Sequence, residues 1–238
     1  MELKVLGSSS KGNCYILDNG KEALVLEAGV PFSKVKQEMK GEIGRIKACL
    51  VSHEHGDHAK YLGQVLEARI DVMMPDAMAE AWKKYRGLVH EAGIESFGGF
   101  KVMAFANNHD VPCVGYMVHH PDMGTLVFAT DTKFVSYKFS NVRTYMIEAN
   151  YSMYLLKENL ENGKVQMNQY KRVVDSHMGI HTAREMLEAN DLSKTSNIVL
   201  LHLSDGNSDE RAFREEIYGV VPEFVGVHIA NEGLKICL

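Results

Sequence analysis

The feature that most constrains this chain is the six-residue segment His53-Glu54-His55-Gly56-Asp57-His58, which follows an apolar run over residues 46–52. Three imidazole rings and two carboxylates so close together cannot form an ordinary core, because buried polar atoms without partners cost free energy. Side chains that fan out from a Gly-containing turn at the end of a strand can instead close on a metal ion. Imidazole and carboxylate groups together suit zinc, manganese or iron. The segment therefore predicts a metal site at the end of a strand.

Length and composition are those of a globular protein. The chain has 238 residues, of which 45% are hydrophobic and 24% charged, and nothing interrupts it, so we predict a single domain over residues 1–238. No apolar run is long enough to span a membrane and the first residues lack a signal-peptide layout, so we expect a cytoplasmic protein. The net charge of −5 argues against binding nucleic acid over the whole surface, but it allows local contact beside bound metal ions.

The four cysteines, Cys14, Cys49, Cys113 and Cys237, are scattered along the chain and form no C-x-x-C pair. Each stands in or beside an apolar or strand-like run. We therefore expect buried, reduced thiols rather than disulfides or metal ligands.

Apolar runs bounded by turn residues predict strands along most of the chain. The expected strands cover residues 4–6, 14–17, 22–26, 46–52, 70–74, 100–106, 114–118, 125–129, 144–147, 198–201, 225–229 and 234–237. Helical spacing predicts helices over residues 33–39, 59–68, 76–85 and 182–189, and over much of 152–174 with a break at 162–163. We expect Asp76 to cap its helix, and Trp82 and Tyr85 to be packing residues.

Strand after strand in this pattern ends in a histidine or an acid. In layered α/β folds, reactive groups gather where strand ends converge, because the loops there vary while the sheet stays rigid. Any one of these histidines alone would be explained more simply as a structural residue, but the whole set together favours metal ligands. The seven candidate ligands are His53, His55, Asp57, His58, His109, Asp131 and His202.

These seven residues, in this order and at strand ends, resemble the signature of the metallo-β-lactamase-fold hydrolases, and the resemblance runs from the first strand to the last. It implies an α/β fold, the four-layer αβ/βα sandwich, in which two mixed β-sheets lie face to face with helices outside. It also implies two divalent metal ions, zinc in the first place and manganese as the alternative. Two such ions close together lower the pKa of a shared water, so that hydroxide is available as a nucleophile near neutral pH.

The resemblance also implies how the ligands are divided between the two ions. One ion would be held by His53, His55 and His109. The other would be held by Asp57, His58 and His202, with Asp131 as the bridge.

Two further segments point to a branch of the family. His202-Leu203-Ser204 after an apolar strand is similar to the RNA- and DNA-processing branch that includes tRNase Z, and Glu148-Ala149 and Ser176-His177-Met178 are similar to its other two signatures. In that branch the acid and the histidine pair, which implies that His177, steadied by Glu148, protonates the leaving oxygen. A poor alkoxide leaving group needs such a proton. Together with Asp57, these two are the candidate catalytic residues, although His177 could also be a helix-capping histidine.

Within that branch, the chain resembles the compact YycJ-type subgroup, which is linked to DNA exonuclease activity. The resemblance is carried by the blocks at residues 7–13, 107–112 and 202–207. Three residues depart from the subgroup's pattern: Tyr151 stands in place of histidine, Glu27 in place of aspartate and Gly179 in place of serine. The long insertion of β-CASP nucleases and the extended basic arm of tRNase Z are both absent, so tRNA is disfavoured as a substrate.

The leading hypothesis is therefore a metal-dependent phosphodiesterase, an exonuclease with DNA ends as substrate. Ser8, Lys11 and Asn13 of the Ser-rich turn are candidate contacts to a backbone phosphate. The alternative is a hydrolase of a small ester, thioester, lactam or cyclic nucleotide, which would use the same metals. A metal-stabilised binding module with little turnover is a third hypothesis, against which the complete ligand set argues.

Overall fold

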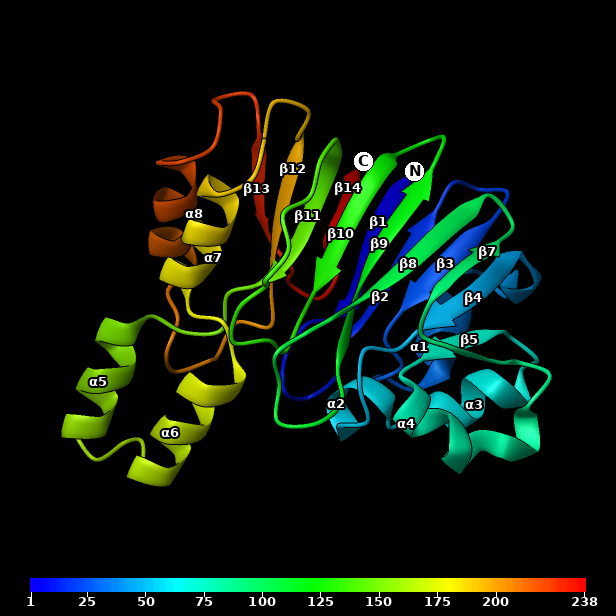
Figure 1. Cartoon of the computed structure of the whole chain (residues 1–238), viewed down its shortest axis with the longest axis horizontal. Helices are drawn as coiled ribbons and strands as arrows, with labels where there is room; N and C mark the ends of the chain where they lie inside the picture. Colours follow the sequence, from blue (N-terminus) through cyan, green and yellow to red (C-terminus); the bar gives the residue numbers. More distant parts are fainter.

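The computed structural model describes residues 1–238 and contains two seven-stranded β-sheets that face each other, with helices on both outer sides (Figure 1). The first sheet consists, in spatial order, of β14 (Lys235–Cys237), β1 (Glu2–Gly7), β2 (Cys14–Asp18), β3 (Ala23–Leu26), β4 (Ile46–Leu50), β5 (Val72–Met74) and β6 (Val89–Glu91). The second consists of β13 (Gly226–Ile229), β12 (Asn197–Leu201), β11 (Val142–Glu148), β10 (Gly124–Ala129), β9 (Val114–His120), β8 (Phe100–Ala106) and β7 (Ile94–Phe97). Both sheets mix parallel and antiparallel pairs, so the predicted four-layer sandwich is confirmed.

Helices form the two outer layers. The first sheet is covered by α1 (Phe32–Glu38), α3 (Leu62–Glu67) and α4 (Asp76–Ala79), with the 3₁₀ helices η1 (Ile43–Arg45) and η2 (Glu80–Tyr85). The second sheet is covered by α7 (Ile180–Glu188) and α8 (Glu210–Tyr218), while α2 (Gly56–Ala59) lies at the ends of the strands. The pair α5 (Met153–Glu161) and α6 (Met167–Ser176) projects beyond the sheets (Figure 1). None of these helices has the length and apolarity that crossing a bilayer requires.

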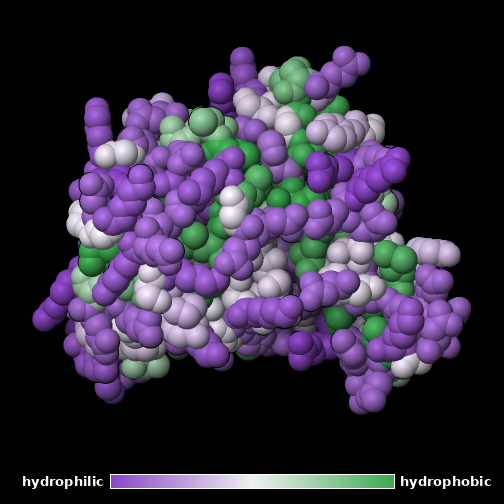
Figure 2. Space-filling view, turned by 180° about the vertical axis from the view of Figure 1, so that it is seen from behind, coloured by the Kyte–Doolittle hydropathy of each residue, from purple (hydrophilic) through white to green (hydrophobic).

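Alternate residues of each buried strand contribute to different layers. In β2, Tyr15 and Leu17 pack between the two sheets, whereas Cys14 and Ile16 pack against the helices outside. Because both faces of the sheet are covered, these strands read as continuous apolar runs rather than as alternating ones. The surface seen from behind is mainly hydrophilic, with apolar residues visible chiefly near its centre (Figure 2).

Two predicted helices differ from the structure. The helix expected over residues 59–68 is broken between α2 and α3, because the Tyr61 N–H donates to the Ala28 carbonyl at 2.9 Å instead of continuing the helix. The helix expected over residues 76–85 becomes a 3₁₀ helix after Ala79, and the backbone of Trp82 inside it is non-helical. Asp76 is the first helical residue rather than the cap, a position that Pro75 occupies without a side-chain hydrogen bond.

Other expectations have mixed outcomes. Trp82 and Tyr85 pack against the core of the first sheet, as predicted. Three of the four cysteines are free and buried, but Cys237 is exposed, because β14 is the edge strand of its sheet. The sequence-based expectation lacked β6, β7 and α8, as well as the short 3₁₀ helix η1.

Parallel pairing decides where the polar strand ends meet. In the first sheet β3 runs parallel to β4, and in the second β10, β11 and β12 run parallel to one another. Carboxyl ends of parallel strands lie at one edge of a sheet, so the polar residues that follow these five strands are brought together at one end of the sandwich.

A buried ion cluster joins β1 and β2 to the segment before β4. The carboxylate of Asp18, with a side chain only 5% exposed, accepts hydrogen bonds from Lys4 Nζ at 3.0 Å and from the Arg45 guanidinium. The Gly20 backbone N–H also donates to it, at 2.8 Å, within the β2–β3 turn. The cluster therefore fixes one end of the first sheet.

We expect Asp18→Asn to lower the free energy of unfolding by about 2 kcal/mol near neutral pH, because it removes the charge of the most buried acid of the cluster, while Lys4 and Arg45 keep only the more exposed Glu2, Glu38 and Glu42. Burial opposes the charge of Asp18, but hydrogen bonds from Gly20, Lys4 and Arg45 hold its pKa below the ordinary value. Since the folded pKa is the lower one, this stabilisation is complete above the unfolded pKa of about 3.9 and is lost as pH falls through the folded value. Urea unfolding at neutral and at acidic pH measures the effect, and the gap between the proteins should shrink in acid. A gap of equal size at both pH values would contradict this assignment.

Candidate metal centre

All seven candidate ligands converge at the carboxyl ends of the parallel strands. The side chains form four overlapping sets, and within each set all the ligand atoms lie within 4.8 Å of one another. The sets are His53, His55 and His109; Asp57, His58 and His202; His53, His58 and Asp131; and Asp131, Glu148, His177 and His202. The first two sets correspond to the two predicted ion sites, and Asp131 lies within reach of both, as a bridging ligand requires.

Strained backbone conformations position three of the polar residues that follow these strands. Glu27 after β3, Asp131 after β10 and His202 after β12 have positive φ angles of 67°, 48° and 54°. For residues other than glycine this region costs of order 1–3 kcal/mol and is retained mainly at functional sites. The strain turns each side chain away from its strand direction and into the common centre.

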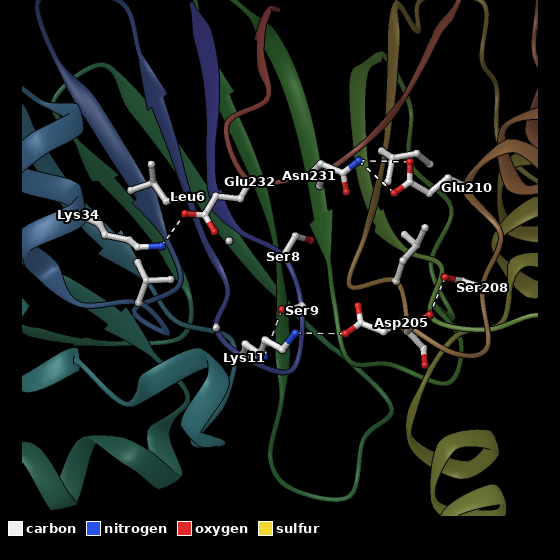
Figure 3. A pocket seen from close by; sticks show the side chains of 17 residues that line it. Leu6, Ser8, Ser9, Lys11, Lys34, Asp205, Ser208, Glu210, Asn231 and Glu232 are labelled. Atoms are coloured by element: carbon white, nitrogen blue, oxygen red, sulfur yellow. Dashed lines mark hydrogen bonds and ion pairs between the residues drawn. The ribbon is translucent and has the colours of Figure 1, made fainter. Parts of the chain in front are cut away.

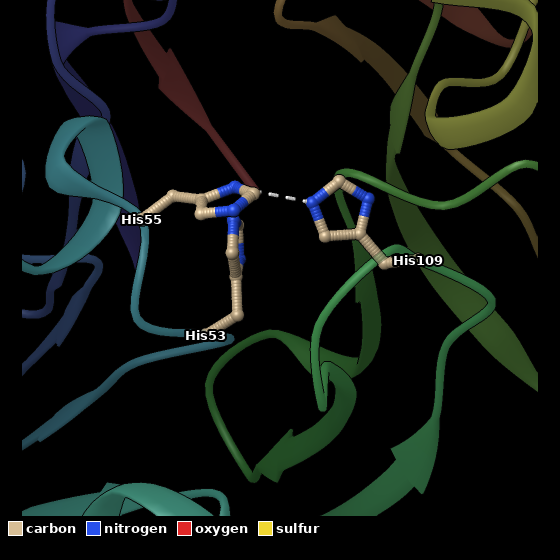
Figure 4. Close-up of side chains that lie close together, drawn as sticks. All are labelled: His53, His55 and His109. Atoms are coloured by element: carbon tan, nitrogen blue, oxygen red, sulfur yellow. Dashed lines mark hydrogen bonds between the residues drawn. The ribbon is translucent and has the colours of Figure 1, made fainter. Parts of the chain in front are cut away.

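The first set, shown in Figure 4, consists of rings with defined orientations. His109 Nδ1–H donates to the Ser176 carbonyl at 3.0 Å, so its Nε2 is left facing His55 Nδ1 at 3.3 Å. His53 Nδ1 is occupied by the Ser52 hydroxyl at 2.9 Å, which leaves Nε2 for the centre. A partner on the outer nitrogen fixes the tautomer and the ring direction of a metal-ligating histidine.

The second set is built around two carboxylates, the partly exposed Asp57 and the buried Asp131. His58 Nε2 lies 3.0 Å from Asp131 Oδ2 and 3.3 Å from Asp57 Oδ2. His202 contacts the same two acids, through Nδ1 to Asp131 at 3.2 Å and through Nε2 to Asp57 at 3.4 Å. Asp131 is held in turn by the Thr130 hydroxyl at 2.8 Å.

The electrostatics of the centre separate its histidines into two kinds. Burial lowers the pKa of His53 to about 2, and it also lowers that of His109, so both rings are neutral. Burial opposes the charge on His58 and His202 as well, but Asp131 outweighs it and raises the pKa of both rings well above the usual range. Their protons occupy positions that a cation would take, and metal binding would release them.

The donors present fit divalent metal ions. His53 Nε2 and His202 Nε2 are buried and have no hydrogen-bond partner, which costs about 1–3 kcal/mol for each group. A cation at each proposed ion site would give each of these nitrogens a partner, once the proton on His202 is released. The set contains five imidazoles and two carboxylates, a combination that suits zinc and related transition metals.

Glu148 and His177 pair beside this centre. His177 Nδ1–H donates to Glu148 Oε1 at 2.7 Å, and the Glu148 carboxylate also accepts from the backbone N–H groups of Met178 and Thr132. Burial would lower the pKa of His177, but the charges of Glu148 and Asp131 raise it. His177 is the C-cap residue directly after α6. Part of its ring is exposed, and the side chain is 13% accessible.

Glu27, the first departure from the subgroup pattern, has a clear structural position. It is fully buried beneath the centre, and its Oε1 lies 3.4 Å from His58 Nδ1. Its carboxylate also accepts from the Ser52 backbone N–H at 3.3 Å. The longer side chain therefore still places a carboxylate beside the outer nitrogen of His58, at ion-pair distance and without a hydrogen bond.

The other two departures, Tyr151 and Gly179, contact each other. A Cβ atom on Gly179 would lie 3.1 Å from the Tyr151 ring, closer than most real contacts of a Cβ atom. The two residues also form a parallel β-bridge. The tyrosine ring thus occupies the space that a larger residue at position 179 would need, which explains why the two departures occur together.

The candidate substrate contacts in the Ser-rich turn have different surroundings. Asn13 is fully buried under the ligands, with Nδ2 at 3.0 Å from His58 Nε2, so no substrate can reach it. The Ser8 hydroxyl accepts from the His202 backbone N–H at 2.9 Å and from Tyr15 Oη at 2.7 Å, and so supports the strained His202. Only Lys11 extends into solvent, with a side chain that is 83% exposed.

The turn borders a cavity of about 500 Å³ in which both lysines already have acidic partners (Figure 3). Lys34 pairs with Glu232 at 2.6 Å and Lys11 with Asp205 at 3.3 Å. Since these charges are neutralised within the chain, this cavity is a poor site for an anion.

Several supporting residues were not identified from the sequence. Ser52 and Thr130 each precede a candidate ligand and hold it through a hydroxyl group, a local signal that could have been used. Asp110, which follows His109 directly, lies with Oδ1 3.0 Å from Nε2, the ring nitrogen that faces the centre. Asn150 donates to the His202 carbonyl at 2.8 Å from another strand end, and no local pattern indicates this contact.

Residues 9–136, more than half of the chain, match the family described as the Metallo-beta-lactamase superfamily. The chain belongs to this superfamily, and with its cluster of histidines and acids it is a metal-dependent hydrolase.

Similarity to individual proteins extends over most of the chain. It is 28% identical over 227 residues to "Exodeoxyribonuclease WalJ" of Streptococcus pneumoniae, covering 86% of this chain and 82% of that protein. It is 24% identical over 243 residues to "Exodeoxyribonuclease YycJ" of Bacillus anthracis, covering 94% and 90%.

Solved structures share the fold at lower identity. The metallo-beta-lactamase fold protein YhfI of Bacillus subtilis superposes with a TM-score of 0.73 at 18% identity, covering 99% of this chain and 98% of that one. The short form of human tRNase Z superposes with a TM-score of 0.64 at 17% identity, with the same coverage. These likenesses concern the arrangement of the sheets and helices.

Proposed function

We propose that this protein is an exonuclease that hydrolyses phosphodiester bonds at DNA ends. The observation that carries the proposal is the Glu148–His177 pair, joined at 2.7 Å and placed against Asp131 and His202. A hydrolase of esters with a good leaving group has little need of a proton donor, whereas an alkoxide leaving group is expelled slowly without one. The similarity to two proteins named exodeoxyribonuclease supports DNA as the substrate.

The centre is proposed to hold two divalent cations, zinc in the first place and manganese as the alternative. His53, His55 and His109 would bind one, Asp57, His58 and His202 the other, and Asp131 both. When bound, the cations would lower the pKa of a water molecule and neutralise charge that develops on the phosphoryl group. Hydrogen bonds to the outer nitrogens of the histidine rings would keep the ligand side chains oriented before substrate binds.

His177 is the proposed general acid. Its Nδ1–H is held by Glu148, so the proton for the leaving oxygen is carried on Nε2. Glu148 remains ionised, because burial would raise its pKa but the charge of His177 and the hydrogen bonds from His177 and His202 lower it. The carboxylate thus orients the ring and stabilises its protonated form.

The direct test is cleavage of a DNA duplex labelled at one end, with and without EDTA and with zinc or manganese restored. We expect a ladder of shortened products that EDTA suppresses by roughly 10³-fold, since about 4 kcal/mol of charge stabilisation is lost. A closed circular duplex without ends should resist cleavage. Absence of product with either metal, or cleavage insensitive to EDTA, would contradict the proposal.

A further inference from the structure

A second cavity, of about 450 Å³, opens directly beside the proposed general acid. One end is lined by His177 and His202 of the metal centre, and the far end by Lys164, Gln169 and Arg172 of the α5–α6 pair. Its volume is typical of ligand pockets, and it has room for part of one nucleic-acid strand but not for a duplex.

The spacing of the side chains on α6 explains this continuity. Gln169, Arg172 and Val173 are three and four residues apart and therefore share one face of the helix. The same face leads to His177 at the end of α6. A ligand that lies along this face would extend from the Glu148–His177 pair to the side chains of Lys164 and Arg172.

The two cationic side chains of this cavity, Lys164 and Arg172, are not neutralised by acids of the chain. Neither Lys164 nor Arg172 has a carboxylate within 4.0 Å or a side-chain hydrogen bond, and both are exposed. The lysines of the other cavity, by contrast, are both paired with acids. In a protein of net charge −5, two free cations at the end of a cavity that leads from the metal centre favour an anionic ligand.

The α5–α6 pair is fixed to the loop that follows His202. Asn159 Nδ2 donates to the Gly206 carbonyl at 2.8 Å and to Asn207 Oδ1 at 3.0 Å. The Ser152 N–H donates to the Asn207 carbonyl at 2.7 Å. A small apolar core of its own, with Leu156 and Val165 buried, stabilises the pair. The α5–α6 pair therefore holds Lys164 and Arg172 at a fixed position relative to the metal centre.

We propose that Lys164 and Arg172 form a second phosphate subsite, which holds a neighbouring phosphate of the strand whose terminal bond is hydrolysed. The inference rests on the proposed nuclease function and narrows it. A substrate with successive phosphodiesters is bound at two points, whereas a small ester or a single phosphodiester reaches only the metal centre. Arginine suits this role because its planar guanidinium binds phosphate oxygens in pairs.

The test compares wild type with the double variant Lys164→Gln/Arg172→Gln. Both side chains are exposed, so folding should be retained. The metal-loaded proteins are titrated with a fluorescein-labelled single strand that carries phosphorothioate linkages, and anisotropy is followed across a salt series. We expect affinity to fall roughly 10- to 100-fold. The slope of log K against log salt should decrease by about 0.7, because the variant loses one phosphate contact and each such contact on a single strand contributes about 0.7.

The matched control is Lys157→Gln/Arg214→Gln, which removes the same charges from exposed positions outside the cavity. It should bind like wild type, since the effect depends on place and not on net charge. A second readout is hydrolysis of bis(4-nitrophenyl) phosphate, which has one phosphate. In the cavity variant, the fold-decrease in kcat/KM on this compound should be about ten times smaller, or less, than the fold-decrease on an oligonucleotide.

Equal affinity of wild type and cavity variant for the strand, or an equal loss in the control variant, would overturn the subsite. A wild-type protein that hydrolyses bis(4-nitrophenyl) phosphate but no nucleic acid would contradict the proposed function instead. In that case the binding titration still decides on the subsite, because it does not depend on cleavage.

Discussion

Replacing Asp131 with asparagine is expected to reduce phosphodiester hydrolysis by roughly 10³-fold, corresponding to about 4 kcal/mol of lost transition-state stabilisation. Among the proposed ligands, Asp131 is the carboxylate within reach of both ion sites: it groups with His53 of the first site and contacts His58 and His202 of the second. Asparagine has nearly the same shape but lacks the charge. It also tolerates the left-handed backbone that Asp131 adopts at φ 48°, so the substitution removes the charge without disturbing the strand end.

Metal content is the second readout of this variant. Elemental analysis of purified wild type should give two divalent ions per chain, and the variant should retain at most one. Asp122→Asn, at an exposed turn beside β10, is the control and should retain both metals and full activity. A variant at position 131 that keeps two ions and normal turnover would exclude a bridging role for this carboxylate.

Replacing His177 with alanine is expected to lower kcat for DNA cleavage by about 10²- to 10⁴-fold, the usual contribution of a general acid. Metal content should stay at the wild-type level, because His177 is not among the seven proposed ligands. The loss should depend on the leaving group. With bis(4-nitrophenyl) phosphate, whose nitrophenolate leaves without a proton, we expect less than about a tenfold decrease.

His181→Ala provides the control for that experiment. His181 stands four residues further on, is 72% exposed and pairs only with glutamates on the surface of α7 and α8. It should leave both substrates unaffected. If His177→Ala slowed the two substrates to the same extent, a role in positioning the metal centre would explain the result better than proton donation.

Local patterns were sufficient to predict most elements of this fold. Twelve of the fourteen strands follow from apolar runs and turn residues. The β2–β3 hairpin and the break at Gly163 between α5 and α6 follow from turn residues with backbone preferences of their own. Strands β6 and β7 were missed because they are short and largely exposed, and so lack an apolar signature. Helix α8 was missed although Asp209 caps it through the N–H groups of Arg211 and Ala212.

Helix boundaries that depend on contacts with distant parts of the chain could not be predicted. The break before α3 is made by the hydrogen bond of Tyr61 to Ala28, a residue beyond β3. Likewise, Ser8 supports His202 although 194 positions separate them. Nothing in the residues around either position indicates such a partner.

The sequence by itself determined the seven ligand candidates, because imidazoles and carboxylates at the ends of apolar strands have few other uses. The sandwich followed from the family resemblance that these ligands carry, and the continuous apolar runs agree with strands buried on both faces. Only the tertiary structure decided what surrounds these ligands. It withdrew Asn13 from the surface, paired Lys11 with Asp205, and brought Lys164 and Arg172 of the α5–α6 pair to a cavity beside His177. The reason is that these surroundings depend on which strands are neighbours in the sheets and on where the α5–α6 pair packs. No short segment of the sequence indicates either.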